Sequence, residues 1–408
     1  MTVDVPLGDG TVAVDLPDSD VTVAEPPGSE PVEDVRAAAA TALDSPLGPP
    51  LSARARDGLD VAIVVTDVTR ATPDEALLDV LLERLVSAGV EREEVTVVVG
   101  LGLHRPMTDE ELETALGPHA DLAVNHDPDA AVRVGTVDDV PILVHPAVAT
   151  ADLVLSTGMV EPHQYAGFSG GAKTVVIGAG GEPFIRYTHG PGMLSRPGVR
   201  LGRVEDNPFR AAIDEAGTFA GPDFCLNVTH GPDGILGVAA GNPGAVVDRL
   251  AGVARDALAV EVEDDYEAVV AGVGAPQDAN LYQATRAATY VALGAHNPLR
   301  VGGRIVVPAA LPEGVGEGTG EQRFYEWLSS ASDAPSLYEE MQDGYEAGAQ
   351  RAFVVARVLR DHEIWITNSD HPEVVEDCLM HPDDDVADAV ESGSDVLVVP
   401  DALNTLLV

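Results

Sequence analysis

Short runs of Val and Ile that alternate with signals for the start of a helix constrain the fold of this chain most strongly. Three such runs lie in the first half, at residues 60–65, 94–99 and 153–156. Apolar runs of this length are typical of strands buried on both faces of a parallel sheet. Strands that alternate with helices along the chain indicate an α/β fold with mainly parallel sheets.

Helix-start signals follow the first two of these strands. Thr72 can cap a helix, and Pro73 fits the first helical position. Glu75 completes a capping box, and Gly89 is expected to end the helix. Residues 108–117 carry the same signals, from a Thr cap to a final Gly. Two strand–helix units therefore follow each other directly.

The second half of the chain continues the pattern. Strands are predicted at residues 266–273, 304–308, 363–367 and 395–399, and helices at residues 279–293, 322–328 and 337–359. The first 51 residues, rich in Pro, Gly, Asp and Val, are expected to form short strands and an arm. We therefore expect two α/β lobes, residues 1–262 and residues 263–408, with the active site in the cleft between them.

Three polar side chains stand just past strand ends. Asp67 and Arg70 follow the first strand, and His104 follows the second. In parallel sheets, ligands bind outside the carboxyl ends of the strands. Arg70 can pair with a carboxylate in a bidentate manner, so this edge is the predicted ligand site.

Lys173 is the only lysine among the 23 Lys and Arg residues of the chain. A lysine that only solvates the surface is replaceable by arginine. A lysine that acts as an amine nucleophile or attachment point is not, because guanidinium stays protonated and forms imines or amides poorly. Lys173 is therefore predicted to do covalent or phosphate chemistry.

Two histidines flank this lysine at a distance along the chain. His163 precedes it by ten residues and His189 follows it by sixteen, and both stand in segments punctuated by Gly and Pro, as His104 does. Imidazole titrates near neutrality and binds borderline metals. These three histidines are the candidates for acid/base or metal-ligand roles, and His126 is a weaker one.

The segment around Lys173 also has the spacing of a P-loop, with Ala172 in place of the last glycine. A P-loop follows a strand directly and opens a long helix. Residues 160–166 make a poor strand, and residues 174–181 are too rich in glycine for a long helix. A nucleotide-hydrolysing enzyme is therefore disfavoured, while Gly170 and Gly171 stay candidates for holding the phosphate of another cofactor.

One predicted helix in the second half carries a polar face. Tyr282, Gln283 and Arg286 lie within one turn of each other, so their side chains share a side of the helix. Arg286 is the second candidate for binding an anion.

The net charge of −45 excludes other classes of function. Nucleic acid and anionic membranes would be repelled, so neither is expected as a partner. Acidity with almost no lysine indicates adaptation to high salt, where charge repulsion is screened.

The two cysteines are far apart and predict neither a disulfide framework nor a zinc site. With no apolar stretch of membrane-spanning length and no basic leader, we expect a cytoplasmic protein.

Taken in order, several motifs resemble the nickel-pincer lactate racemase family. They are Asp67-Val68-Thr69-Arg70, Gly102-Leu103-His104-Arg105-Pro106, Asn125-His126-Asp127, the stretch from Pro162 to Lys173, then His189, and Asn280-Leu281-Tyr282-Gln283. The likeness runs from about residue 60 to about residue 290. Its most specific part is the order His163, Lys173, His189.

The resemblance implies a cofactor and a reaction. Lys173 would hold a pyridinium-3,5-bisthiocarboxylate-type mononucleotide through a thioamide, and His189 would be the fourth ligand of its nickel ion. The reaction would invert C2 of a 2-hydroxy acid, with lactate favoured, by reversible hydride transfer to the cofactor. His104 and His163 would then serve as acid and base on the hydroxyl group. Maturation enzymes would be needed as partners.

The resemblance also implies which residues contact the substrate. Arg70 would clamp the carboxylate, Asp67 would support Arg70 or a histidine, and Gln283 with Tyr282 would position substrate or cofactor. Arg286 stands where the lactate enzymes of the family have lysine, so the charge is kept on a wider, planar group.

Two other functions stay open from the residues alone. One is a use of Lys173 without nickel, either in an enzyme that forms a Schiff base or in a P-loop-like nucleotide-binding protein. The other is a non-catalytic binder that retains the pocket.

Overall fold

The computed structural model describes residues 2–263, 265–346 and 348–408, which form two compact units. Residues 28–189 and 202–257 make the first, here called the Lys173 unit. Residues 1–27, 190–201 and 258–408 make the second, the Arg286 unit. The fold is mixed α/β with mainly parallel sheets, as the sequence predicts.

The units are discontinuous, whereas the sequence predicted two continuous lobes divided after residue 262. Strand β3 (Asp20–Val23) pairs in parallel with β19 (Asp395–Val399), which places the amino-terminal segment in the Arg286 unit. Helix α6 (Pro191–Leu194) belongs to the same unit, and the carbonyl of Leu194 accepts a hydrogen bond from Arg357. Long-range strand pairing of this kind leaves no local signal in the sequence.

The Lys173 unit is built on a six-stranded sheet of order β13-β12-β9-β4-β5-β6. Its strands are β4 (Val61–Thr66), β5 (Val95–Gly100), β6 (Ala123–Asn125), β9 (Leu153–Met159), β12 (Phe224–Gly231) and β13 (Gly234–Gly241). All pairs are parallel except β12 with β13. The predicted strands at residues 60–65, 94–99 and 153–156 are therefore neighbours in one sheet.

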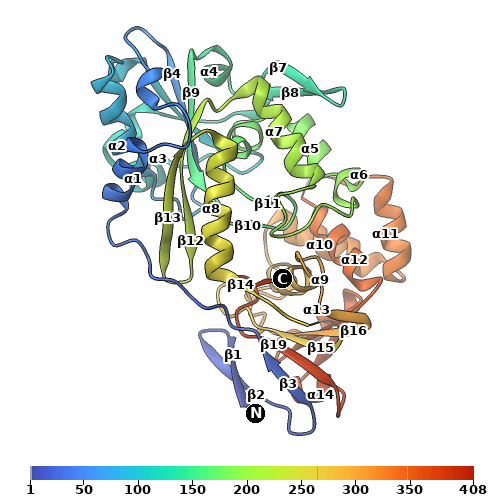
Figure 1. Cartoon of the computed structure of the whole chain (residues 1–408). Coiled ribbons are helices and arrows are strands. Elements are labelled where there is room, and N and C mark those ends of the chain that lie inside the picture. The colour runs from blue at the N-terminus through green and yellow to red at the C-terminus, as the bar shows by residue number, and fades with distance from the viewer. Residues whose placement is uncertain (1, 264, 347) are drawn as a thin grey trace. The chain divides into compact units, whose positions relative to one another are not determined.

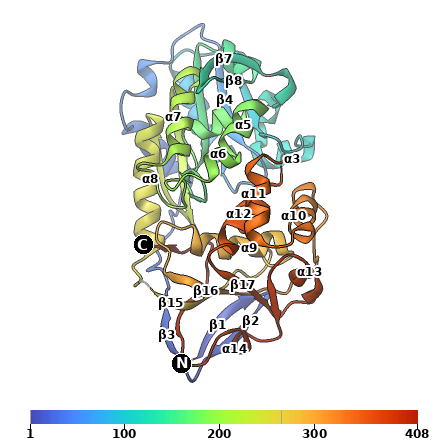
Figure 2. The same ribbon diagram turned by 90° about the vertical axis from the view of Figure 1, so that its right-hand side faces the viewer.

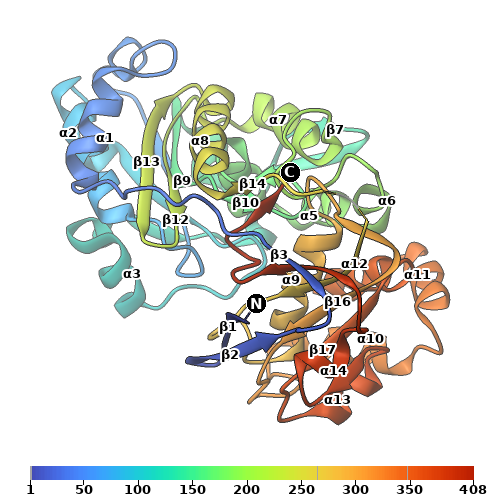
Figure 3. The ribbon, with the colours of Figure 1, turned by 60° about the horizontal axis from the view of Figure 1, so that its bottom comes forward.

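Apolar side chains of helices α1 (Val35–Asp44), α2 (Asp74–Ser87) and α3 (Asp109–Leu116) pack on one face of this sheet and form a hydrophobic core with its strands. Helix α8 (Pro243–Leu258) lies along β12 and β13 (Figures 1 and 3). The remaining elements are α4 (Pro146–Thr150), α5 (Glu182–Thr188), α7 (Pro208–Ala220) and the hairpins β7–β8 (Val132–Val137, Val140–Val144) and β10–β11 (Pro162–His163, Gly167–Phe168).

The Arg286 unit has its own six-stranded, fully parallel sheet of order β18-β17-β16-β15-β19-β3. Beside β3 and β19 it contains β15 (Tyr266–Ala271), β16 (Leu299–Pro308), β17 (Glu363–Thr367) and β18 (His381–Asp383). A short ladder, β14 (Ala259–Val260) with β20 (Leu406–Leu407), lies outside it.

Two layers cover this second sheet. The hairpin of β1 (Thr2–Leu7) and β2 (Gly10–Asp15) and helix α14 (Val386–Ala389) pack on one face. Figure 2 shows helices α9 (Leu281–Ala292), α10 (Thr319–Ser330), α11 (Ala334–Gln342) and α12 (Gln350–Leu359) on the other face. Helix α13 (Pro372–Asp377) connects β17 to β18.

Two helix predictions differ from the structure. The helix predicted to be capped by Thr72 begins at Asp74, because Thr72 instead accepts a hydrogen bond from the Thr66 hydroxyl and no side chain caps the helix. The helix predicted over residues 337–359 is two helices, α11 and α12. Gly344 and Gly348, with φ of 122° and 97°, stand between them in a conformation that a helix does not contain.

The helix predicted to begin at Thr108 and end at Gly117, in contrast, is confirmed. Thr108 and Glu111 form a capping box at the start of α3, and Gly117 ends that helix. Among the described residues, no helix is long and apolar enough to cross a membrane.

The core of the Lys173 unit gives a stability prediction. Val64 in β4 is fully buried, whereas Val132 in β7 is 41% exposed. We expect Val64→Ala to lower the free energy of unfolding by about 2 kcal/mol, because it removes buried methyl groups and leaves a cavity. The matched Val132→Ala should cost less than about 0.5 kcal/mol. Urea denaturation of both variants measures the difference, and equal losses would contradict the assigned burial.

Candidate active site

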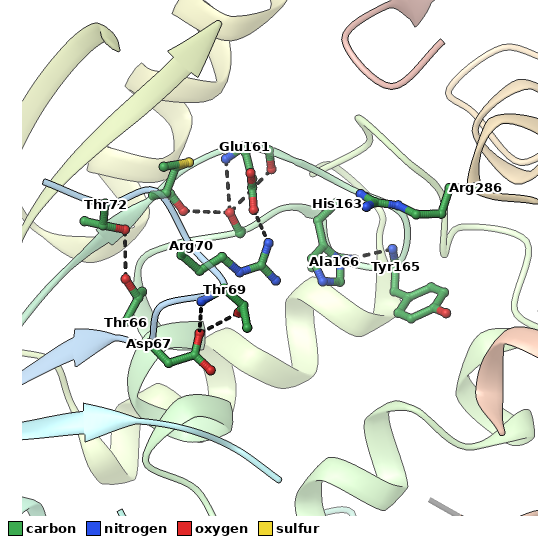
Figure 4. Close-up of polar contacts among 12 residues, drawn as sticks. Thr66, Asp67, Thr69, Arg70, Thr72, Glu161, His163, Tyr165, Ala166 and Arg286 are labelled. Atoms are coloured by element: carbon green, nitrogen blue, oxygen red, sulfur yellow. Dashed lines mark hydrogen bonds and ion pairs between the residues drawn. The ribbon is translucent and has the colours of Figure 1, made fainter. Parts of the chain in front are cut away.

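The turn after β4 holds the first two predicted site residues. The Asp67 carboxylate accepts hydrogen bonds from the backbone N–H and the hydroxyl of Thr69. The backbone N–H of Arg70 donates to the carbonyl of Asp67 at 3.0 Å. Asp67 is buried and Arg70 is exposed, and Figure 4 shows the guanidinium extending from this turn toward Glu161.

Asp67 also meets His104, which follows the neighbouring strand β5. The distance from Asp67 Oδ2 to His104 Nδ1 is 2.6 Å. Burial raises the pKa of Asp67, but the hydrogen bonds from His104 and Thr69 outweigh it and hold the pKa below its usual value. An ionised carboxylate only accepts, so Nδ1 of His104 carries the proton. Nε2 then carries the lone pair of the ring and can act as a base.

His163 lies in the short antiparallel hairpin of β10 and β11, where it pairs with Gly167. The backbone N–H groups of Tyr165 and Ala166 both donate to His163 Nδ1 at 3.2 Å (Figure 4). Nδ1 is therefore the acceptor, and in the neutral ring the proton sits on Nε2. His163 and His104 thus carry their protons on opposite ring nitrogens.

The surroundings of His163 keep its ring neutral. Burial lowers its pKa well below the ordinary value of 6.5, and the positive charges of Lys173 and Arg70 lower it further. At neutral pH, His163 is consequently a hydrogen-bond donor through Nε2.

Lys173 lies at the end of the glycine-rich turn and is followed by a single π-helical turn, Thr174–Gly178. The long helix of a P-loop is absent there. Burial lowers the pKa of Lys173 to about 7, and the charges of Arg70 and Arg210 contribute. A large fraction of the amine is therefore unprotonated at neutral pH and able to act as a nucleophile.

His189 stands at the carboxyl end of α5, and contacts at its Nδ1 atom fix the orientation of its ring. Nδ1 lies 3.1 Å from the carbonyl of Ile185 and 3.0 Å from the hydroxyl of Thr188, which itself donates to the carbonyl of Phe184. Both oxygens can accept, so Nδ1 carries the proton and Nε2 the lone pair. Burial lowers the pKa of His189 to about 4, with a contribution from Lys173. A neutral imidazole whose second nitrogen is fixed by a carbonyl is the usual form of a metal-ligating histidine.

Gly170 and Gly171 shape the turn that precedes Lys173. Their φ angles are 80° and 59°, and a Cβ atom would lie 2.6 Å from Val160 and 2.8 Å from Val247, respectively. The carbonyl of Gly170 accepts from Arg210, and the N–H of Gly171 donates to Asn227. These packing contacts explain why both residues are glycine, and a contact with a cofactor stays a prediction.

An aromatic cluster, which the sequence reading missed, packs against the two histidines. The ring of Phe209, at the start of α7, lies 5.1 Å from that of His189 and 6.2 Å from that of His163. Tyr165 contacts both histidines as well. Asn207 caps α7 and donates to the carbonyl of Tyr165, which joins the hairpin to that helix.

Three charged residues near the site were also missed. Glu161 forms an ion pair with Arg70. Arg210 is buried and pairs with Asp214, four residues away, a spacing that in the sequence looks like an ordinary surface pair. Asp74 is buried against Thr157 and Thr66, and burial raises its pKa to about 7.

In the Arg286 unit, helix α9 presents the predicted polar face. Every residue of α9 is buried except Tyr282, Gln283 and Arg286. Asn280 caps the helix by accepting from the backbone N–H of Gln283. Arg286 donates to the Tyr290 hydroxyl at 3.3 Å, and Arg351 lies 4.8 Å over the ring of Tyr282. The six remaining predicted side chains, Asp67, Arg70, His104, His163, Lys173 and His189, lie in the Lys173 unit.

No group of three or more His, Cys, Asp or Glu side chains suited to a metal ion occurs among the described residues. His189 would therefore need ligands from elsewhere to hold a metal.

Two family descriptions match the chain: the lactate racemase N-terminal domain over residues 7–202, and the lactate racemase C-terminal domain over residues 262–406. The chain belongs to the lactate racemase family. This membership makes the protein an isomerase of the racemase class.

Curated relatives agree with this family, and solved structures share the fold. The chain is 26% identical to a lactate racemase of Thermoanaerobacterium thermosaccharolyticum, with 99% of each chain covered. It is 27% identical to a lactate racemase of Lactiplantibacillus plantarum, over 90% of this chain and 89% of that one. The apoprotein structure of the T. thermosaccharolyticum enzyme shares the fold over both full chains, with a TM-score of 0.87 and 24% identity. A Thermotoga maritima protein is similar at a TM-score of 0.62 and 17% identity, over 91% of this chain and 96% of that one.

The low pKa of Lys173 is directly measurable, because the chain has one lysine. We expect trace acetylation of protein that carries no group on Lys173 to follow a titration near pH 7, the value to which burial lowers the pKa. Peptide mass spectrometry reads the acetylated fraction at each pH, with the amino terminus as internal standard. An inflection near the ordinary lysine pKa of about 10.4 would contradict the assigned environment.

Proposed function

We propose that the protein inverts C2 of a 2-hydroxy acid, with lactate the favoured substrate, and that it does so with a nickel-pincer mononucleotide attached to Lys173. The observation that carries the proposal is the pair of Lys173 and His189. The first is an amine with a pKa of about 7, and the second is a neutral imidazole with its lone pair on Nε2. Family membership supports the racemase reaction itself.

The residues present fit such a cofactor. Lys173 offers an attachment point, and His189 offers one ligand. A single protein ligand matches a metal whose other ligands belong to the attached group, which agrees with the lack of a three-residue ligand cluster among the described residues. When bound, the group supplies the acceptor for the hydride of C2 and the donor that returns it.

The side chains of the Lys173 unit would bind the substrate and move its proton. Arg70 binds the carboxylate of the 2-hydroxy acid. Nε2 of His104, which the Asp67 contact at Nδ1 leaves with the lone pair in the neutral ring, accepts the proton of the C2 hydroxyl and gives it back. Inversion requires the planar 2-keto acid to turn its other face to the hydride donor before the hydride returns, because return to the same face would regenerate the starting enantiomer. His163 would hold the C2 oxygen by donating from Nε2–H. The polar face of α9, with Tyr282, Gln283 and Arg286, is assigned to positioning substrate or cofactor.

The first test is the intact mass and nickel content of protein purified from its own source, combined with a chiral assay on L- and D-lactate. The proposal predicts an added mass on the Lys173 peptide, near-stoichiometric nickel and racemisation. Protein made without the maturation enzymes should lack all three. Racemisation by protein with unmodified Lys173 and no nickel would contradict the cofactor assignment.

His104 and His163 carry their protons on opposite ring nitrogens, and this difference gives a second test. His104→Gln should lower kcat by about 100- to 10,000-fold in both directions, because it removes the base. His163→Gln should lower kcat by less than about ten-fold, because glutamine keeps a hydrogen-bond donor. Steady-state kinetics of holoenzyme with equal nickel content make the comparison. Equal losses in the two variants would show that His163 also carries the proton.

A Schiff-base enzyme is the second candidate, favoured by the same low pKa of Lys173. It predicts that borohydride treatment in the presence of pyruvate adds a reduced adduct to the Lys173 peptide. The nickel-pincer proposal predicts no adduct, because the amine is already acylated.

A further inference from the structure

Glu161 is a site residue that neither the motifs nor the proposed proton transfer uses. It lies two residues before His163, just ahead of β10, and Figure 4 shows the two side chains on the same side of the hairpin. Its carboxylate reaches across to Arg70, which comes from the turn after β4 (Figure 4). An acidic group therefore contacts the guanidinium that the proposed function assigns to the substrate carboxylate.

The backbone of Glu161 is fixed on both sides by one serine. The N–H of Glu161 donates to the Ser169 hydroxyl at 3.0 Å, and the carbonyl of Glu161 accepts from the N–H of Ser169 at 2.9 Å. The same hydroxyl donates to the carbonyl of Met159 at 2.6 Å, and Ser169 is buried. The carboxylate is thus anchored to the segment that carries Lys173, and only its side-chain torsions are adjustable.

The Arg70–Glu161 contact uses one corner of the guanidinium. Glu161 Oε1 meets Nη1, and within the described part of the chain the guanidinium makes no other side-chain hydrogen bond or ion pair. A guanidinium has five N–H donors, and the edge formed by Nε and Nη2 matches a carboxylate in a bidentate manner. Arg70 is 40% exposed at its side chain, so a long, flexible group would otherwise sample many orientations.

We propose that Glu161 is a positioning residue for substrate binding. It engages Nη1 of Arg70 and so holds the Nε–Nη2 edge toward the carboxylate of the 2-hydroxy acid. Because Glu161 and His163 lie on the same side of the β10–β11 hairpin, this hairpin sets the orientation of the carboxylate clamp and of the group that holds the C2 oxygen. This inference rests on the proposed function, in which Arg70 binds the substrate carboxylate.

The test compares Glu161→Ala and Glu161→Gln in the holoenzyme. Glu161→Ala should raise KM at least about ten-fold for both enantiomers while kcat changes less than about three-fold, because ordering of the clamp is lost before chemistry begins. Glu161→Gln keeps an acceptor oxygen for Nη1, so it should restore most of the loss. Glu83→Gln is the matched control, since it removes an ion pair with Arg36 that is exposed to solvent, and its KM should match that of the unaltered enzyme.

A double-mutant cycle separates positioning from a structural effect. If Glu161 acts through Arg70, then Glu161→Ala should cause no further rise in KM once Arg70→Ala is present. A further rise of the same size in that background would overturn the proposal. An unchanged or lower KM in Glu161→Ala alone would also overturn it, because Glu161 would then be idle or would compete with the substrate.

Calorimetric titration of pyruvate and lactate into the same variants keeps this result distinct from the failure of the proposed function. If the unaltered holoenzyme does not racemise lactate but binds it, the proposed reaction fails, and weaker binding by Glu161→Ala still supports the positioning role. If neither acid binds to the unaltered protein, both the substrate class and the role of Glu161 are wrong.

Discussion

The group that meets Nδ1 of each site histidine decides which ring nitrogen carries the proton, and the chemistry of the site depends on these three contacts. A carboxylate meets His104, two backbone N–H groups meet His163, and a carbonyl meets His189. The first contact makes a base, the second a hydrogen-bond donor and the third a ligand. Three identical side chains thus acquire different roles from their partners alone.

Those partners are placed by the fold. Asp67 and His104 meet because β4 and β5 are adjacent parallel strands whose carboxyl ends share one edge. The backbone donors to His163 come from the tight turn of the β10–β11 hairpin, which Asn207 ties to α7. Lys173 and His189 lie in the same unit, where burial keeps the imidazole uncharged and leaves a large fraction of the amine uncharged at neutral pH.

Local patterns in the sequence were sufficient for much of this arrangement. The strand ends at Asp67 and His104, the Thr108 capping box and the polar face of α9 all follow from short-range spacing. The predictions that were wrong or missing depended on contacts outside the predicted motifs or on burial. Glu161 lies 91 residues from Arg70, and Arg210 looks like a surface helix residue until the fold buries it. Thr72 does not cap α2, because its hydroxyl accepts a hydrogen bond from Thr66. Strand β3 pairs with β19, which lies near the other end of the chain.

The central claim is that His163 has the opposite tautomer to His104 and His189, and nitrogen-15 NMR of histidine-labelled protein measures this directly. Two-bond proton–nitrogen correlations distinguish a protonated ring nitrogen from one with a lone pair, and single His→Gln variants assign the signals. The account predicts protonation at Nδ1 for His104 and His189, and at Nε2 for His163, at neutral pH. The same tautomer for His104 and His163 would contradict it.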